Sequence, residues 1–463
     1  MNSSRVVGAF ACLLSICAIC TAQTTSPAIA NEARVLSGAA VVPQTAAPIP
    51  VTLKDAIQRA QKIYSQYLSS VTDAQIARED ALQARNAMLP SFSYQQQYLG
   101  TQGNGKTPDG RFVTNDGIHV YRLWPTMHEE IPAGFYSSAS YKRAKAGVAL
   151  AQAKAEIARR GLVVTVTKDF YTSIAAQRKY AAAQQSAGQA QQFLDDTTKL
   201  ERGGEVAHAD VVKAQLQLDQ QRIALREADL AMQNAHLALT VLISQTFDEN
   251  FSAVDDMEHM PILPPMPELQ ALAARENQDI RGALLTLQQA NADVSIARAG
   301  FFPTFSLDAV YGIEANAIAL HSAQAAAKDL GPLPNLGYFI TATATVPIWN
   351  WGTTRSKLKQ AELKREQAQV DLTQTQREAL SNFYSAYNEA SAARAEIEIL
   401  RDAADRAAES LRLTNLRYRA GESTALEMVD AQNALTAARN SLDDGQARYR
   451  VAIASLQTLT GEF

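Results

Sequence analysis

Two long stretches of the chain contain no proline and consist mainly of helix-forming residues. No proline occurs between Pro132 and Pro261, and none follows Pro347. Because proline removes a helical hydrogen bond and clashes with the preceding turn, such stretches can hold long helices. Both are dominated by Ala, Leu, Gln, Glu, Arg and Lys, which have high helix propensity.

Each proline-free stretch is too long for one helix, so a turn has to divide it. The helix breakers in suitable places are Gly203 and Gly204 in the first stretch and Gly421 in the second. The arm before each turn runs about 65 to 70 residues, roughly 100 Å at about 1.5 Å per residue. Helices of that length must pack side by side on other helices, because no globular core is so deep.

The returning arms are shorter, at about 205–246 and 423–459. Two more helical segments, at about 52–88 and 268–300, have the length needed to extend them end to end. Each half of the chain is therefore predicted to supply one continuous long helix and one composite helix. Apolar residues set among many alanines suit close antiparallel packing in a coiled coil.

Between the helices the pattern changes to alternation, which predicts β-strands. In one such segment Phe305, Leu307 and Tyr311 alternate with Ser306 and Asp308. Segments of about ten residues, apolar on one face and polar on the other, match the strands of a transmembrane barrel. The four predicted strands lie at about 90–100, 118–131, 303–314 and 336–348.

The first two strands differ in regularity. In the first, Phe92, Tyr94 and Tyr98 share one face. The second contains Pro125, which cannot donate a hydrogen bond to a ladder and is awkward in a central strand. The second strand is therefore the weakest of the four predictions.

The same phrases occur twice in the chain, in the same order. "RGGEVAHADVVKAQ" matches "RAGESTALEMVDAQ", and "ARNAMLPSFS" matches "ARAGFFPTFS". The offsets are about 213 to 217 residues, which indicates an internal duplication far longer than a solenoid repeat. We therefore expect repeat 1 at residues 51–260 and repeat 2 at residues 261–463.

Four strands cannot close a barrel alone. An open sheet edge in lipid leaves unpaired backbone groups that cost several kcal/mol each, so the chain is predicted to oligomerise. Two copies would give eight strands and a filled barrel, whereas three would give twelve strands and a water-filled lumen. The alternating pattern alone leaves both possibilities open.

Aromatic residues gather where the predicted strands meet the helices, as in an interfacial aromatic girdle. These residues are Phe301, Phe302, Trp349 and Trp351. All helices are then expected on one side of the membrane, the periplasmic side. Loops near 101–117 and 315–335 are expected on the other side.

The N-terminal residues have the pattern of a secretory signal peptide. Small residues suit cleavage after Ala22 or, less well, after Ala30. We predict a signal peptide at 1–22 and a disordered lead-in, rich in Ala, Thr, Ser and Pro, at 23–50. All 3 cysteines lie in the signal peptide, so the mature chain has no thiol chemistry. An isoleucine precedes each cysteine that could carry a lipid, which argues against a lipid anchor.

Charge and side-chain chemistry argue against several function classes. The formal net charge is −4 and no basic patch with interleaved aromatics occurs, which argues against nucleic acid as a partner. The 6 histidines have no metal-ligand spacing, and the "HEE" run at 128–130 fits a solvated strand end better than a metal site. No nucleophile elbow or phosphate loop is present. We expect neither an enzyme nor a bound cofactor or metal.

Several phrases together resemble the TolC-like outer-membrane efflux protein family. They are "VTLKDAIQRA", the paired "ARNAMLPSFS" and "ARAGFFPTFS", "VPIWNWGTTRSKLKQAEL" and "YRAGESTALEMVDAQNAL". The resemblance implies a mainly α protein in which long helical hairpins form a periplasmic α-barrel. It further implies a homotrimer with a twelve-stranded transmembrane β-barrel. The implied function is passive export of drugs or proteins across the outer membrane, with a periplasmic adaptor and an inner-membrane pump as partners.

The resemblance also assigns roles to individual residues. The adaptor-docking tips fall on Gly203, Gly204, Tyr418 and Gly421. An acidic ring at the channel constriction falls on Asp210, Glu427 and Asp430. Ser423 stands where some members have an arginine that helps to hold the channel shut, which puts such a latch in doubt here.

A periplasmic coiled-coil scaffold without a pore is the alternative. It would account for the long helices, but not for alternating segments that turn Tyr, Phe, Leu and Ile to one face. The strands therefore favour the export channel.

Overall fold

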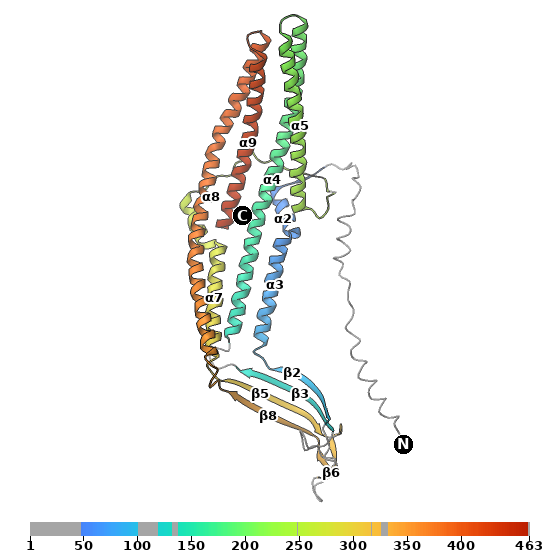
Figure 1. Ribbon diagram of the computed structural model, residues 1–463, viewed down its shortest axis with the longest axis vertical. Coiled ribbons are helices and arrows are strands. Elements are labelled where there is room, and N and C mark those ends of the chain that lie inside the picture. Colours follow the sequence, from blue (N-terminus) through green and yellow to red (C-terminus); the bar gives the residue numbers. More distant parts are fainter. Residues whose placement is uncertain are drawn as a thin grey trace, which may run out of the picture.

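The computed structural model describes residues 48–100, 119–131, 138–247, 249–315, 317–325 and 332–461. The molecule is elongated, with two helical hairpins at one end and a β-sheet at the other (Figure 1). The predicted signal peptide, almost all of the predicted lead-in, and the 101–117 loop lie outside the described residues. None of the described helices combines the length and apolar composition that a membrane-spanning helix needs.

The predicted helical hairpins are present in both halves of the chain. In the first half, α4 (Ala139–Arg202) turns into α5 (His208–Ile243). In the second half, α8 (Thr353–Arg419) turns into α9 (Ala425–Thr460). The outgoing helices have 64 and 67 residues, close to the expected length.

Each returning helix is continued toward the sheet by further helices, as predicted (Figure 1). In the first half these are α2 (Leu53–Ile63) and α3 (Ser65–Asn86). In the second half they are α6 (Met266–Glu276) and α7 (Gln278–Ala299). The long helix α4 packs against α3, α5, α7 and α9, so it joins the two halves.

The two added segments were predicted as single helices, and this was wrong. Each breaks at one residue, at Tyr64 (φ −67°, ψ 114°) and at Asn277 (φ −68°, ψ 116°). Neither residue is Gly or Pro, so the pattern carried no strong break signal. Asn277 restarts a helix because its side-chain oxygen accepts hydrogen bonds from the N–H groups of Asp279 and Ile280.

A small parallel β-pair near the middle of the molecule was not predicted. It joins β1 (Ile49–Val51) to β4 (Phe251–Ala253). β1 starts inside the segment expected to be a disordered lead-in, which was predicted to extend to residue 50. Val51 and Phe251 are buried in the largest apolar cluster, together with Phe170 of α4. Three-residue strands are too short to show an alternating pattern.

The four predicted strands form one antiparallel sheet, in the order β2-β3-β5-β8. Their bounds are β2 Ser91–Gly100, β3 His119–Ile131, β5 Thr304–Ala315 and β8 Leu336–Thr345. β2 and β8 are the two edges and have no further partner among the described residues. The expected 315–335 loop also contains a short hairpin of β6 (His321–Ala325) and β7 (Pro332–Pro334).

The register gives the sheet one apolar and one polar face. One row of paired residues across the four strands reads Phe92, Met127, Ala309 and Ile340. The adjacent row, on the opposite face, reads Ser91, His128, Asp308 and Thr341. The predicted alternation is therefore present in the pairing of the strands.

β3 is a central strand despite its proline. Its pairing with β5 includes Leu123 and Thr126 but omits Trp124 and Pro125, so the missing N–H falls where the ladder is interrupted. A Cβ at Gly312 of β5 would lie 2.1 Å from the Leu123 carbonyl oxygen. Only glycine permits that approach.

Candidate functional site

The two hairpin turns have the same backbone structure. In the first, Glu205 N–H donates to the Leu200 carbonyl at 2.9 Å, and in the second, Glu422 N–H donates to the Arg417 carbonyl at 2.9 Å. These bonds close a left-handed helix cap, a geometry that favours glycine. Gly204 (φ +78°) and Gly421 (φ +75°) occupy the left-handed position, whereas Gly203 is helical (φ −75°).

Tyr418 lies beneath the turns rather than on their surface. It is only 7% exposed and packs against Phe193 of α4, with ring centroids 5.1 Å apart. Its hydroxyl lies 2.9 Å from the hydroxyl of Thr197, which is also buried. Burial raises the pKa of Tyr418, an effect that Asp210 and Asp196 reinforce and the Thr197 hydrogen bond opposes. Tyr418 thus ties the second hairpin to the first.

A pocket of about 200 Å³ lies between the two hairpins just behind the turns. Phe193 and Asp196 of α4, Asn415 and Arg419 of α8, and Gln432 of α9 contribute to its wall. The walls carry both apolar and polar side chains. Further from the turns, Gln217 of α5 donates to Asn433 of α9 at 3.0 Å.

The three predicted constriction residues lie at the starts of α5 and α9. Asp210 contacts Lys213 at 3.4 Å, and Asp430 is exposed. The Glu427 carboxylate accepts hydrogen bonds from the hydroxyls of Ser423 at 2.7 Å and Thr424 at 3.4 Å. The backbone N–H of Glu427 donates to the Thr424 hydroxyl at 3.3 Å. Asp210 and Glu427 lie in the first turns of their helices and also interact favourably with the positive helix ends.

Ser423, at the position where some family members have a latch arginine, contacts its own turn. Ser423 bonds Glu427, and Arg417 lies 3.9 Å from the same carboxylate. Arg417 also donates to the Glu422 carbonyl at 3.3 Å. These bonds hold the turn of the second hairpin to its own helix. Near the other turn, His208 pairs with Glu201 at 2.7 Å and is 79% exposed, as expected of a surface histidine.

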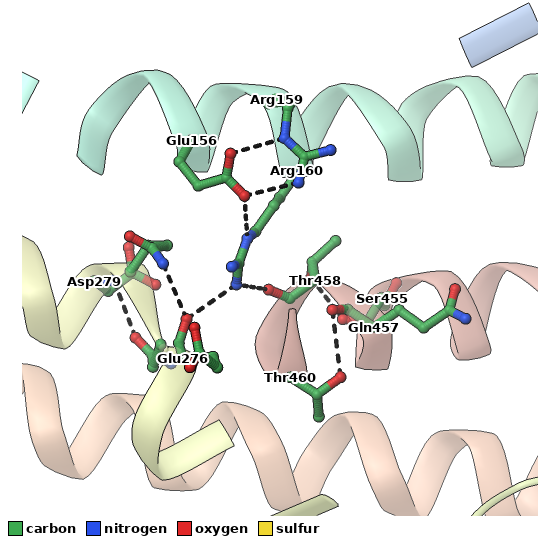
Figure 2. A network of polar contacts seen from close by, with 11 residues as sticks. Glu156, Arg159, Arg160, Glu276, Asp279, Ser455, Gln457, Thr458 and Thr460 are labelled. Atoms are coloured by element: carbon green, nitrogen blue, oxygen red, sulfur yellow. Dashed lines mark hydrogen bonds and ion pairs between the residues drawn. The ribbon is translucent and has the colours of Figure 1, made fainter. Parts of the chain in front are cut away.

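About one third of the way along α4, Arg160 joins the two halves of the chain (Figure 2). Its side chain is 9% exposed and bonds Glu156 at 2.9 Å. One terminal nitrogen donates to the carbonyls of Glu276 at 3.1 Å and Thr458 at 2.8 Å. Those carbonyls lie at the ends of α6 and α9, where the composite helix of the second half is interrupted. Hydrogen bonds from Arg159 hold the pKa of Glu156 below its usual value, while burial opposes them.

A second polar cluster lies closer to the turns and binds the link between the halves. Arg178 of α4 forms two bonds with Asp255, at 2.5 and 2.8 Å, and a third with Asp443 of α9 at 3.1 Å. Arg450 of α9 donates to the carbonyl of Asp256 at 2.5 Å. Sequence analysis missed both arginine clusters, because their partners are distant in the chain.

The predicted girdle aromatics lie at the two junctions between sheet and helix. Phe301 and Phe302 precede β5 and are about half exposed, at 48% and 46%. Trp349 and Trp351 follow β8 and are 75% and 88% exposed. The two indoles contact edge to face at 5.7 Å.

The polar face of the sheet carries paired charges rather than a metal site. His128 lies 2.6 Å from Asp308, and Arg122 lies 2.7 Å from Glu314. Among the described residues, no group of three or more His, Cys, Asp or Glu side chains is arranged to hold a metal ion.

Comparison with known proteins agrees with this geometry. The TolC outer membrane protein of Vibrio cholerae is 22% identical over 412 residues, 88% of this chain and 90% of that protein. The cation efflux system protein CusC of Escherichia coli is 30% identical over 246 residues, 52% of this chain and 50% of CusC. The crystal structure of the CmeC outer membrane channel of Campylobacter jejuni has a TM-score of 0.77 at 18% identity. That match covers 89% of this chain and 85% of the channel.

The family assignment rests on a match in each half of the chain. The family model described as outer membrane efflux protein matches residues 56–245 and 269–462, one segment for each helical hairpin. The chain therefore belongs to the outer membrane efflux protein family.

Proposed function

We propose that this protein is the outer-membrane exit duct of a tripartite efflux system and works as a homotrimer. The sheet carries the argument, because it has one apolar face, one polar face and two unpaired edges. Lipid does not tolerate open edges, so β2 and β8 must pair with other copies. Three copies give twelve strands and a water-filled lumen lined by the polar face.

The flanks of the helical part support assembly with further copies. Helix α5 lies on one flank and α8 on the other (Figure 1). Each presents apolar side chains at seven-residue spacing that are roughly half exposed or more, a pattern that suits helix packing. On α5 they include Leu216, Ile223, Leu230 and Leu237, and on α8 Leu363 and Val370.

The helical turns would receive a periplasmic adaptor that couples the duct to an inner-membrane pump. They lie farthest from the sheet and expose Gly203, Gly204 and Gly421, where a partner backbone can approach closely. Tyr418 acts from below by holding the two hairpins together. Asp210, Glu427 and Asp430 would ring the channel just inside the turns and favour cations.

The aromatic residues at the sheet junctions would mark the membrane interface. Phe301, Phe302, Trp349 and Trp351 are exposed there, as amphipathic rings at the headgroup level are in other membrane proteins. The sheet would then contact the lipid of the outer membrane, and the helices would lie in the periplasm.

Cross-linking between sheet edges tests the assembly. The mature chain contains no cysteine if cleavage follows Ala22, so new thiols can be placed singly. Ser93→Cys on β2 with Thr341→Cys on β8 should give covalent dimers and trimers in membranes treated with a flexible thiol cross-linker. Thr126→Cys alone, on the central strand β3, is the control and should give monomers, because β3 is not an edge strand.

Transport is tested in the same cells. Deletion of the gene should raise ethidium accumulation, and the unlinked variants should restore efflux. The proposal would be contradicted if the Ser93→Cys/Thr341→Cys variant gave only monomers and deletion of the gene left ethidium accumulation unchanged.

A further inference from the structure

The helix ends next to the sheet carry an excess of positive charge. Helix α4 has no acidic residue before Glu156, and α8 has none before Glu362. Within their first two turns lie six exposed cations, which we call the basic collar. They are Lys142, Arg143 and Lys145 on α4, and Arg355, Lys357 and Lys359 on α8.

These charges oppose the usual preference of a helix start. The positive end of the helix dipole favours acidic residues in the first turn. The helices α2, α5, α6, α7 and α9 follow that rule, with Asp55, Asp210, Glu268, Asp279 and Glu427 respectively. Neither α4 nor α8 has an acidic residue in its first turn or a side-chain cap. Helix α3 also has neither, but its first turns carry no cluster of cations. An external anion would relieve the repulsion in α4 and α8.

The collar adjoins an exposed apolar segment. Ile348 is 90% exposed, Trp349 75% and Trp351 88%, and α8 begins at Thr353. Lys359 lies six residues beyond that start, about 9 Å along the helix axis. Along the axis of α8, the distance from the aromatic residues to the farthest cation is therefore about the thickness of a lipid headgroup layer.

Little within the chain neutralises the collar. Arg143 pairs with Asp293 of α7 at 2.5 Å, whereas the other five cations form no ion pair within the described part of the chain. Cations that are spread over two helices suit binding to an extended anionic surface. They are too dispersed to enclose one small anion. Aromatic side chains beside them indicate that this surface belongs to a bilayer.

We propose that the basic collar binds the anionic phospholipid headgroups of the membrane leaflet on the helical side. This rests on the proposed placement of the sheet in the outer membrane. Each cation near an anionic surface should strengthen the interaction by about fivefold at moderate salt. The collar would thereby set the depth of the barrel and retain anionic lipid around it.

Lipid retention by the purified trimer tests the proposal. Native mass spectrometry should show phosphatidylglycerol retained by the wild type in preference to phosphatidylcholine, and added salt should reduce that preference. Lys357→Gln with Lys359→Gln should weaken phosphatidylglycerol binding about tenfold or more. Arg401→Gln with Arg406→Gln, on the same helix far from the sheet, removes the same charge and should change nothing.

Three results would overturn the proposal. The first is unchanged phosphatidylglycerol binding by the Lys357/Lys359 double variant. The second is displacement of the lipid by inorganic phosphate at low millimolar concentration, which would show a free-phosphate site. The third is altered ion selectivity with unaltered lipid binding, which would place the cations in the lumen. Edge-to-edge cross-linking and ethidium efflux report separately on the exit duct itself.

Discussion

Replacing Arg160 by alanine should loosen the joint between the two halves of the helical part. Arg160 is a residue of the first half, yet its terminal nitrogen holds carbonyls at the ends of α6 and α9, both in the second half (Figure 2). These carbonyls have no partner within their own helices, since a helix leaves its last four unsatisfied. Arg160→Ala removes the buried stem of the side chain and one donor to each carbonyl, while Glu276 still accepts from the Gln278 side chain at 3.2 Å.

The magnitude follows from what remains after the change. Breaking a buried ion pair costs about 3 to 5 kcal/mol when it strands a charge. Here Glu156 keeps two bonds from Arg159, both at 2.7 Å, so its charge stays paired. The loss is then two charge-assisted hydrogen bonds to carbonyls plus packing, and we expect about 3 kcal/mol. Such a loss corresponds to a roughly hundredfold increase in local opening.

Hydrogen exchange is the appropriate assay, because the effect is local. In the Arg160→Ala variant, amides in the last turn of α9 and the last turn of α6 should exchange about a hundredfold faster. The global melting temperature should fall by only about 3 °C, since about 2.1 cal/mol/K per residue spreads the loss over a long chain.

Arg159→Ala is the matched control. It removes a neighbouring guanidinium that is 29% exposed, for which we expect less than about 1 kcal/mol. If Arg160→Ala and Arg159→Ala gave the same exchange rates at the end of α9, the assignment of Arg160 as a double helix cap would be wrong.

Three further predictions concern the turns and the helical part. Replacing Gly204 or Gly421 by leucine should strain a left-handed residue by about 1 to 2 kcal/mol and abolish efflux while trimers still form; normal efflux from both variants would exclude the turns from docking. Glu427→Ala with Asp430→Ala should weaken cation selectivity and relieve block by polyvalent cations in planar bilayers, and unchanged block would place the selecting charges elsewhere. Burial lowers the pKa of His236, so stability should be full above about pH 6.5 and fall as the pH drops below it. Melting curves at pH 7.5 and 5.5 should show that loss in the wild type and a smaller one in His236→Gln.

The large elements could be predicted because each depends on a local signal that repeats over many residues. Proline gaps and helix propensity predicted α4 and α8 as helices of about 65 to 70 residues, and they have 64 and 67. Two glycines with positive φ marked the turns, where no other residue is as easily accommodated. Alternation over ten residues or more predicted all four strands of the sheet, including β3 with its proline.

The breaks and the joints could not be predicted in the same way. Tyr64 and Asn277 interrupt helices without a strong breaker, because packing at the middle of the molecule decides their conformation. The two carbonyl groups that Arg160 binds belong to residues 116 and 298 positions away in the chain, so no local sequence pattern predicts these bonds. Among the proposed site residues, Tyr418 was expected at a docking surface and lies buried instead, since its ring fills the space between the two hairpins.

The duplication explains why the two halves look alike, but their joints have different chemistry. In the first half, the junction of α5 with α2 is covered by the largest apolar cluster, to which β1 and β4 contribute Val51 and Phe251. In the second half, the corresponding junction of α9 with α6 has a small apolar cluster around Phe383, and Arg160 supplies the missing attachment. An apolar joint resists shear only through packing, whereas directed hydrogen bonds to helix ends fix an angle. We therefore expect the joint of the first half to tolerate small shifts and the joint of the second half to keep its angle as long as Arg160 is present.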